Sequence, residues 1–266
     1  MSAAETTPPR DQLTTLRLAL AEKGYRPVPV SGPKMNVPSA GKRPLMKNWR
    51  ELCAHADAAE IARWTRAEQN CTNTGLLCGD LVGVDVDVLA PDLVKKIGAA
   101  AKETLGITPL VRIGKAPKLL LCYRAAAPFP KMETPELFFP DGSKAQVEVL
   151  AAGQQFVAHG IHPDTGQPYE WPRCAPEAIP LADLPDVSES TLRAFLAAAE
   201  GILREGGGQT QAERDGKPSK AQSAPKAAAP GAKVIDFKKA TGKAPSEYRA
   251  GRGDIGDGDV GGGEAE

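Results

Sequence analysis

One short run constrains the fold of this chain most, because residues 81–88 (LVGVDVDV) alternate without interruption between valine and other residues. Successive side chains of a β-strand point to opposite faces of the sheet. The valines therefore share one face, and Gly83, Asp85 and Asp87 share the other. The run predicts a strand that buries its valine face in the core and carries two carboxylates on the opposite face.

Two carboxylates side by side on one strand repel each other, and a cation relieves that repulsion most directly. Glu148 stands between Val147 and Val149 in a second alternating run and can supply a third carboxylate from a neighbouring strand. Three acids on a sheet suit Mg²⁺ or Mn²⁺, whose shell is completed by water and phosphate oxygens. We therefore predict two such ions on Asp85, Asp87 and Glu148. A solvent-facing strand with two ordinary aspartates is the alternative.

The total charge is balanced, with 33 Lys and Arg against 33 Asp and Glu. This balance argues against a protein that coats nucleic acid by bulk charge. Two windows, residues 34–50 and 112–131, nevertheless hold five cations each and no acid. Acids flanked by cations suit phosphoryl or nucleotidyl transfer, because metals hold the reacting phosphate and cations neutralise the remaining charge. Two solvated basic loops are the alternative.

Hydrophobic spacing and capping residues predict helices that begin near Asp11, Asp57, Pro91 and Ser188, and a strand at 26–30. Three pairs of β-rich runs are predicted to form hairpins: 74–78 with 81–89, 109–113 with 118–124, and 147–150 with 155–159. Because most strand pairs are predicted hairpins, the fold class is α+β, with a largely antiparallel sheet and flanking helices.

The composition changes after Arg204, beyond which no leucine occurs and Gly, Pro, Ser and Gln dominate. Such a stretch buries too little apolar surface to offset its ordering entropy. We therefore predict a folded domain at 10–204 and a disordered tail at 205–266. The tail is basic first (8 basic and 4 acidic residues in 205–243) and acidic afterwards (2 and 6 in 244–266). Val234, Ile235 and Phe237 form a candidate docking motif within it.

The chain has no apolar run long enough to span a membrane and no secretory signal at its polar start, so we expect a cytoplasmic protein. Its five cysteines form no CxxC pair, which favours reduced, core thiols over a disulfide framework. His159 and His162 have the spacing of a zinc-ligand pair, but no nearby residue completes a tetrahedral site.

Several ordered blocks together resemble the bifunctional DNA primase/polymerase (prim-pol) N-terminal domain of the archaeo-eukaryotic primase superfamily. The resemblance covers about residues 12–185 and is more specific than any single block. The blocks are Gly24-Tyr25 with Pro29-Val30, GKRP at 41–44 with Trp49, NTG at 73–75 with Gly79, VDVDV at 84–88, VRIG at 111–114, and VE at 147–148 followed by GIHP at 160–163 and YEW at 169–171. The resemblance implies an RRM-like sheet that carries the acids. It also implies template-directed synthesis of DNA or short primers from nucleoside triphosphates.

Under this resemblance, Asp85 and Asp87 correspond to the first metal-binding motif and Glu148 to the third. The second motif departs from the family, because Lys118 stands where members usually place a histidine against the triphosphate. Lysine can meet a phosphate as a point charge, but it cannot act as a neutral proton carrier.

The resemblance also implies a set of phosphate-binding side chains. His162 is among them because the GIHP turn closes the pocket near the third motif, whereas His159 is expected to be a structural neighbour. The predicted nucleotide or phosphate ligands are Arg112, Lys115, Lys118, His162, Lys42 and Arg43. For Lys42 and Arg43, which would serve template or nucleotide, ordinary surface charge is the alternative.

The resulting hypothesis is a DNA primase/polymerase that uses Mg²⁺ or Mn²⁺, (d)NTPs and a single-stranded DNA template. No GxxxxGK[ST] sequence is present, so a separate helicase or replication protein is the expected partner. The resemblance implies a phage, plasmid or other mobile element. A catalytically inactive protein that binds single-stranded or origin DNA is one alternative. A DxD glycosyltransferase is another, although it leaves Glu148 without a role.

Overall fold

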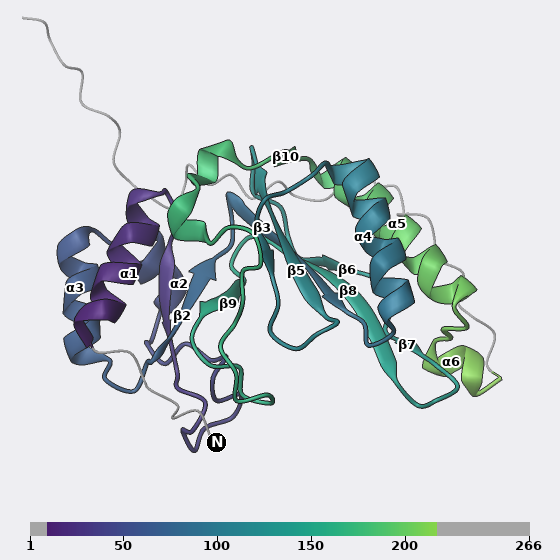
Figure 1. The fold of residues 1–266 in the computed structure, drawn as a ribbon, viewed down its shortest axis with the longest axis horizontal. Helices are drawn as coiled ribbons and strands as arrows, with labels where there is room; N and C mark the ends of the chain where they lie inside the picture. Colours follow the sequence, from purple (N-terminus) through teal and green to yellow (C-terminus); the bar gives the residue numbers. More distant parts are fainter. Residues whose placement is uncertain (1–9, 217–266) are drawn as a thin grey trace, which may run out of the picture. The chain divides into compact units, whose positions relative to one another are not determined.

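A computed structural model describes residues 10–216 of the chain, which form two β-sheets with helices packed on their outer faces (Figure 1). The predicted helices are present with the expected capping residues at Asp57 and Ser188. The helices are α1 (Arg10–Glu22), α2 (Trp49–His55), α3 (Ala58–Ala67), α4 (Pro91–Leu105), α5 (Glu189–Glu205) and α6 (Gln211–Arg214), with 3₁₀ turns at Pro176–Ala178 and Leu181–Asp183.

The larger sheet has the strand order β10-β5-β3-β8-β6, with β4 also paired to β5 and β7 also paired to β8. Every pairing is antiparallel except that between β10 and β5. Its strands are β3 (Leu81–Asp87), β4 (Val111–Arg112), β5 (Leu119–Ala125), β6 (Met132–Glu133), β7 (Leu137–Phe138), β8 (Lys144–Leu150) and β10 (Asp186–Val187).

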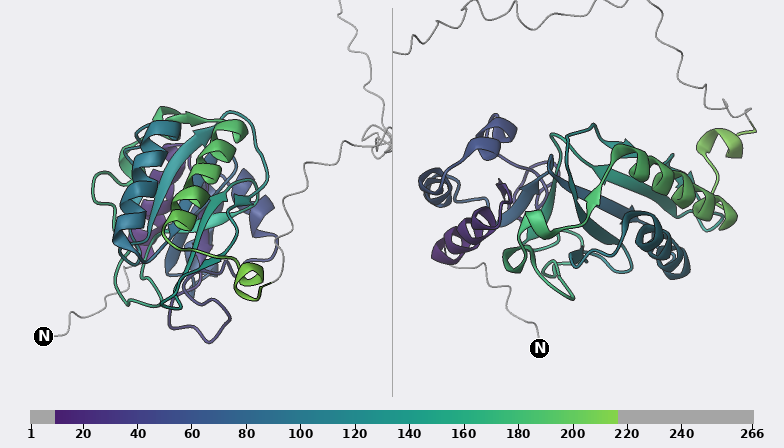
Figure 2. Two further views of the ribbon diagram at one scale, coloured as in Figure 1. Left: turned by 90° about the vertical axis from the view of Figure 1, so that its right-hand side faces the viewer. Right: turned by 90° about the horizontal axis from the view of Figure 1, so that it is seen from above.

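The smaller sheet has the order β1-β2-β9 and is antiparallel throughout. Its strands are β1 (Pro27–Val30), β2 (Asn73–Leu77) and β9 (Gln155–His159). The α+β class with largely antiparallel sheets and flanking helices is therefore confirmed. Both termini of the described part and the positions of α1–α3 beside the smaller sheet can be followed in Figure 2.

The valine face of β3 lies in the main core, as predicted. Val82, Val84 and Val86 are fully buried beneath α4 and α5, which pack side by side over this face of the larger sheet (Figure 1). Burying a side chain of this size contributes about 1.5–3 kcal/mol relative to leaving it exposed. The alternation of the sequence therefore fixes which face of β3 meets the helices and leaves its acids on the other face.

Two of the three predicted hairpins are wrong, because their strands lie in different sheets. β2 pairs with β1 and β9, whereas β3 pairs with β5 and β8. A two-residue hairpin loop needs positive φ at its first central residue, and neither Gly79 nor Asp80 adopts it. The 147–150 and 155–159 runs separate in the same way, between β8 and β9. Only the pairing of the 109–113 and 118–124 runs is confirmed, by β4 and β5.

The two crossings from one sheet to the other run beside each other. The Cys78 N–H donates to the Gln154 carbonyl at 2.9 Å, which joins the segment after β2 to the segment before β9. On β3, Gly83 faces the Phe156 ring of β9, and a Cβ there would lie only 3.1 Å from it. The absence of a side chain at Gly83 thus lets the smaller sheet approach the acid-bearing face of the larger one.

The folded part extends past the predicted boundary at residue 204. Thr210 caps α6, because its hydroxyl and the Glu213 side chain form a reciprocal capping box, and Arg204 on α5 pairs with Glu213 at 3.1 Å. These local polar contacts order the segment around α6, although the segment has too few apolar residues to form a core of its own. The docking motif at Val234, Ile235 and Phe237 lies outside the described residues. Within the described part, no helix is long and apolar enough to cross a membrane.

Candidate active site

The three predicted acids lie together on the face of the larger sheet that is opposite the helices. Asp85 on β3 is directly opposite Glu148 on β8, and Asp87 lies two residues further along β3. Residues in register on adjacent strands point to the same face, with Cβ atoms about 4.5–5.5 Å apart. The sheet register therefore brings Glu148 to the side of Asp85 and Asp87.

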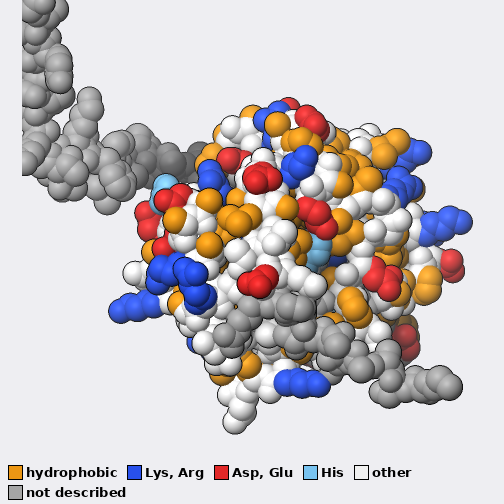
Figure 3. All heavy atoms as spheres, turned by 60° about the vertical axis from the view of Figure 1, so that its left-hand side comes forward, with side chains coloured by type: hydrophobic (Ala, Val, Ile, Leu, Met, Phe, Trp, Pro, Cys, Tyr) orange, Lys and Arg blue, Asp and Glu red, His pale blue; other side chains and the backbone are white. Residues whose placement is uncertain are grey.

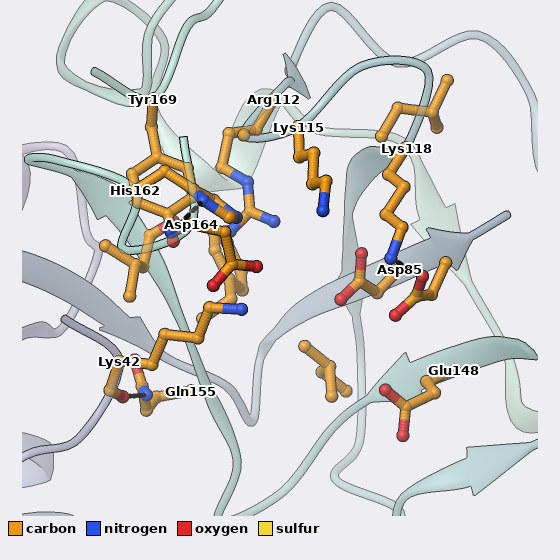
Figure 4. A pocket seen from close by; sticks show the side chains of 16 residues that line it. Lys42, Asp85, Arg112, Lys115, Lys118, Glu148, Gln155, His162, Asp164 and Tyr169 are labelled. Atoms are coloured by element: carbon orange, nitrogen blue, oxygen red, sulfur yellow. Dashed lines mark hydrogen bonds and ion pairs between the residues drawn. The ribbon is translucent and has the colours of Figure 1, made fainter. Parts of the chain in front are cut away.

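These acids form one wall of a cavity of about 260 Å³, seen in Figure 4. Of the nine predicted site residues, eight line the cavity, and Arg43 does not; it is exposed elsewhere on its loop. The lining also includes Gln155, Asp164 and Tyr169. The predicted residues that line it are Lys42, Asp85, Asp87, Arg112, Lys115, Lys118, Glu148 and His162.

Two lysines neutralise the acids at the edges of this wall. The Lys118 ammonium group pairs with Asp87. The Lys131 ammonium group pairs with Glu148 and, at 2.6 Å, with Glu133, which stands directly opposite Glu148 on β6. Within residues 10–216, no three acidic, histidine or cysteine side chains are close enough together to hold a metal ion as they lie. Asp87, Glu133 and Glu148 on this sheet face are thus each turned toward a lysine.

Asp85 lies between the other two acids and has no ion pair of its own in the described part of the chain. Burial raises the pKa of Asp85, the Arg112 guanidinium lowers it, and the neighbouring Asp87 and Glu148 raise it further. The net effect is a pKa above the usual value, because burial and like charges disfavour the ionised form. Asp85 is therefore the carboxylate that gains most from an added cation.

Arg112 is fixed rigidly on the side of the cavity that faces Asp85. One terminal nitrogen, Nη1, donates to the Val157 carbonyl at 2.6 Å, and the guanidinium carbon lies 4.9 Å from the Tyr169 ring centre and 5.6 Å from that of Phe156. A guanidinium stacked on aromatic rings loses little further entropy on binding an anion. Arg112 thus offers a preorganised positive charge to a phosphate group.

His162 lies at the opposite end of the cavity from Glu148 (Figure 4). Its Nδ1 accepts a hydrogen bond from the Asp164 N–H at 3.2 Å, so the ring proton is on Nε2. Burial lowers the pKa of His162, and Lys42, Arg112 and Lys115 lower it further against the opposing effect of Asp164. The imidazole is therefore neutral at pH 7 and can donate from Nε2.

His159 does not share a site with His162. Its Nε2 lies 3.1 Å from Glu177, and its ring is 6.2 Å from that of Trp171. The described residues thus provide no zinc site for the pair. Cys53, Cys71, Cys78 and Cys122 are free and buried, as expected of core thiols, and Cys174 is free and half-buried.

Sequence reasoning missed Lys131 and Glu133 as neighbours of the acids and Asp164 as a partner of His162. β6 has only two residues, which is too short for a hydrophobic alternation to reveal, and its register beside β8 depends on the fold. The contact between Asp164 and His162 arises within one turn, and the HPD sequence at 162–164 is the only signal for it. Basic and acidic side chains both occur across the face of the described part shown in Figure 3.

One cavity beside an antiparallel sheet thus combines paired acids, preorganised cations and a neutral imidazole, an arrangement whose chemistry suits a polyanionic, phosphate-bearing ligand. A family model described as "Bifunctional DNA primase/polymerase, N-terminal" matches residues 17–187 of the chain. The chain therefore belongs to this prim-pol family, and its activity class is primase/polymerase-type nucleotidyl transfer. No curated protein matches the chain.

Proposed function

We propose that this chain is a metal-dependent primase/polymerase that adds nucleotides from (d)NTPs to a 3′-hydroxyl on a single-stranded DNA template. The observation that carries the proposal is the direct cross-strand register of Asp85 and Glu148, with Asp87 beside them, in a cavity whose other wall is cationic. A glycosyltransferase would leave both Glu148 and the family match without an explanation.

The residues at the acid wall fit Mg²⁺ or Mn²⁺. Asp85, Asp87 and Glu148 supply the hard oxygen ligands that these ions prefer. Burial and the two neighbouring acids raise the pKa of Asp85 despite the nearby Arg112, so an added cation at this wall would favour its ionised form. When bound, two such ions supply charge neutralisation at the reacting phosphate and activation of the 3′-hydroxyl. Lys118 and Lys131 would then leave the carboxylates, and Lys118 would be free to turn toward the cavity.

The cationic wall binds the triphosphate in this proposal. Arg112 and Lys115 neutralise phosphate oxygens nearest the acids, and Lys42 does so from the smaller sheet's side of the cavity. His162 donates from Nε2 to a phosphate oxygen, and it thereby supplies the imidazole that the second motif lost when Lys118 took the family's usual histidine position. In this proposal, Lys118 contributes a positive charge to phosphate binding, and His162 contributes a directed hydrogen bond to a phosphate oxygen.

Replacing Lys131 by Met is expected to strengthen Mn²⁺ binding about fivefold, because the lysine competes with the ion for Glu148. A fivefold change corresponds to about 1 kcal/mol, the upper end of what an exposed ion pair contributes. Free Mn²⁺ measured by electron paramagnetic resonance gives the affinity without any turnover. Lys144→Met is the matched control, since Lys144 pairs with Glu136 at the far end of β8. An unchanged or weaker affinity in Lys131→Met would contradict the competition.

The proposed function is tested with the full chain, a single-stranded DNA template and labelled nucleotides, with Mg²⁺ or Mn²⁺ and with and without a primer. We expect template-dependent products that disappear when the metal is chelated. Products without a primer indicate primer synthesis, and products only with one indicate extension. The absence of products with every nucleotide, metal and primer combination would refute the proposal.

A second candidate is a non-catalytic protein that binds single-stranded or origin DNA. The lysine at position 118 favours it, because the family's second-motif histidine is absent and both edge acids are paired with lysines. Metal-dependent binding of a nucleoside triphosphate favours the enzyme, and metal-independent binding of single-stranded DNA alone favours the module. A separate helicase or replication partner, docked through the tail, and a phage, plasmid or mobile-element setting are further proposals that rest on the family resemblance.

A further inference from the structure

Asn73, the first residue of β2, is buried and uses its whole side-chain amide to join two loops. Its Nδ2 group donates to the Gly41 and Ile161 carbonyls, each at 2.9 Å, and its Oδ1 accepts from the Ile161 N–H at 3.0 Å. The residue is only 1% exposed. The residues that follow its partners in sequence are Lys42 and His162, which both line the cavity.

The two loops meet directly beside these hydrogen bonds. Gly41 has a φ of +80°, and a Cβ on it would lie 3.2 Å from the Pro163 ring. Neither Gly41 nor His162 belongs to a strand or helix. Backbone hydrogen bonds hold each loop separately, from the Ser31 N–H to the Arg43 carbonyl at 2.9 Å and from the His162 N–H to the Gln167 carbonyl at 2.8 Å. Asn73 links the two loops to each other through its three side-chain hydrogen bonds.

Asn73 has little freedom to move. Its carbonyl accepts from Nη2 of the fully buried Arg17 at 3.2 Å, and it pairs with Val30 of β1. A Cβ on Gly160 would lie 2.0 Å from Asn73 Oδ1, so only glycine permits the close approach there. Because the Asn73 side chain is held this tightly, it fixes both loops relative to the smaller sheet.

We propose that Asn73 is a positioning residue that sets the separation of Lys42 and His162, and with it the phosphate-binding side of the cavity. The expected effect on triphosphate binding rests on the proposed function, whereas the positioning of the two loops by Asn73 does not. Asn73 does not line the cavity and acts only through the loops that it joins. Removing the Asn73 amide leaves buried backbone groups of both loops without their partner, so we expect both phosphate-binding contacts to loosen together.

Asn73→Asp is the sharpest variant, because it has the same size and keeps the acceptor for Ile161 N–H while losing both donors. Hydrogen exchange of the full chain, followed by mass spectrometry, should show faster exchange in peptides covering 40–43 and 160–163 together. Peptides from β3 should be unchanged. Asn70→Ala, an exposed asparagine on the same approach to β2, is the control. Asn73→Ser removes the donors without adding charge and replaces the aspartate variant if that variant unfolds.

The consequence for binding is measured with deoxyadenosine triphosphate and Mn²⁺ in the absence of template. We expect affinity about tenfold weaker in Asn73→Asp, and a Lys42→Ala change that costs less in that variant than in the natural protein, because Lys42 is already displaced. Unchanged exchange, or a change in only one loop, overturns the proposal. Suppose instead that exchange becomes faster in both loops of Asn73→Asp, but the natural protein binds no triphosphate. That result would overturn the proposed function and leave the positioning role of Asn73 intact.

Discussion

Replacing Asp85 by Asn is expected to reduce templated nucleotide incorporation by about a hundredfold or more, while the protein stays folded. Asparagine has the same shape but cannot supply the central anionic ligand, and loss of one group that stabilises charge in a transition state costs a factor of this order. Incorporation by equal amounts of the two proteins, on the same primed template, measures the effect.

The same substitution is expected to stabilise the metal-free protein at neutral pH. The pKa of Asp85 is raised in the folded state, so ionising it disfavours folding, and the penalty is relieved as pH falls through that raised pKa. Asparagine never ionises. The advantage of Asp85→Asn in the free energy of unfolding should therefore be present at pH 7 and shrink toward the ordinary pKa of aspartate.

Added Mn²⁺ should reverse that order, because an ion that binds only the folded natural protein adds to its stability. Thermal unfolding of both proteins with and without the ion gives this comparison. Asp92→Asn, at an exposed position in the first turn of α4, controls for the loss of a carboxylate elsewhere. Full incorporation by Asp85→Asn would remove the residue from the active site, and a destabilised metal-free variant would contradict the electrostatic argument.

The second large effect is expected from Gly114→Ala in the turn between β4 and β5. A Cβ at Gly114 would lie 2.7 Å from Tyr169 Cε1 and 2.8 Å from His162 Cδ2. Both rings line the cavity and contact each other at a centroid distance of 5.2 Å, so neither can move without changing the site. Overpacking of this kind costs about 1–3 kcal/mol. We expect triphosphate affinity to fall about tenfold or more, measured by titration with a fluorescent nucleotide and Mn²⁺.

Gly98→Ala is the matched control for this substitution. Gly98 lies inside α4, and a Cβ there would meet nothing within 4 Å. Alanine in a helix interior is favoured over glycine by about 0.8–1 kcal/mol, so the control should gain stability in a denaturant titration and bind the triphosphate normally. Normal binding by Gly114→Ala would mean that His162 and Tyr169 are not held against the turn.

The sequence predicts the parts of the site that depend on periodicity. The alternation around Asp85 determines which face of β3 is buried, and a similar alternation around Glu148 gives the orientation of β8. The family resemblance predicts His162, whereas Lys42 is also part of the basic window at 34–50. Arg43 was predicted with Lys42, but adjacent residues in a loop point in different directions, and it lies outside the cavity.

The sequence predicts only one of the three proposed hairpins correctly, that of β4 and β5, because strand pairing depends on turn geometry and on long-range packing. Gly79-Asp80 has the spacing of a hairpin loop, yet the chain there crosses from one sheet to the other. Lys131 reaches Glu148 only because the two-residue strand β6 lies beside β8. Asn73 gives no local sign of its role, since its partners are 32 and 88 residues away.

The division of the cavity between two sheets has a consequence for how its specificity can change. Asp85, Asp87 and Glu148 belong to strands of the larger sheet, whereas Lys42 and His162 belong to loops that Asn73 on the smaller sheet holds. Under the proposed function, we expect substitutions in those loops to alter the shape presented to a substrate without disturbing the strand register of the acids. Substitutions in the loops can thus change which substrate binds, while the acids on the larger sheet keep their arrangement.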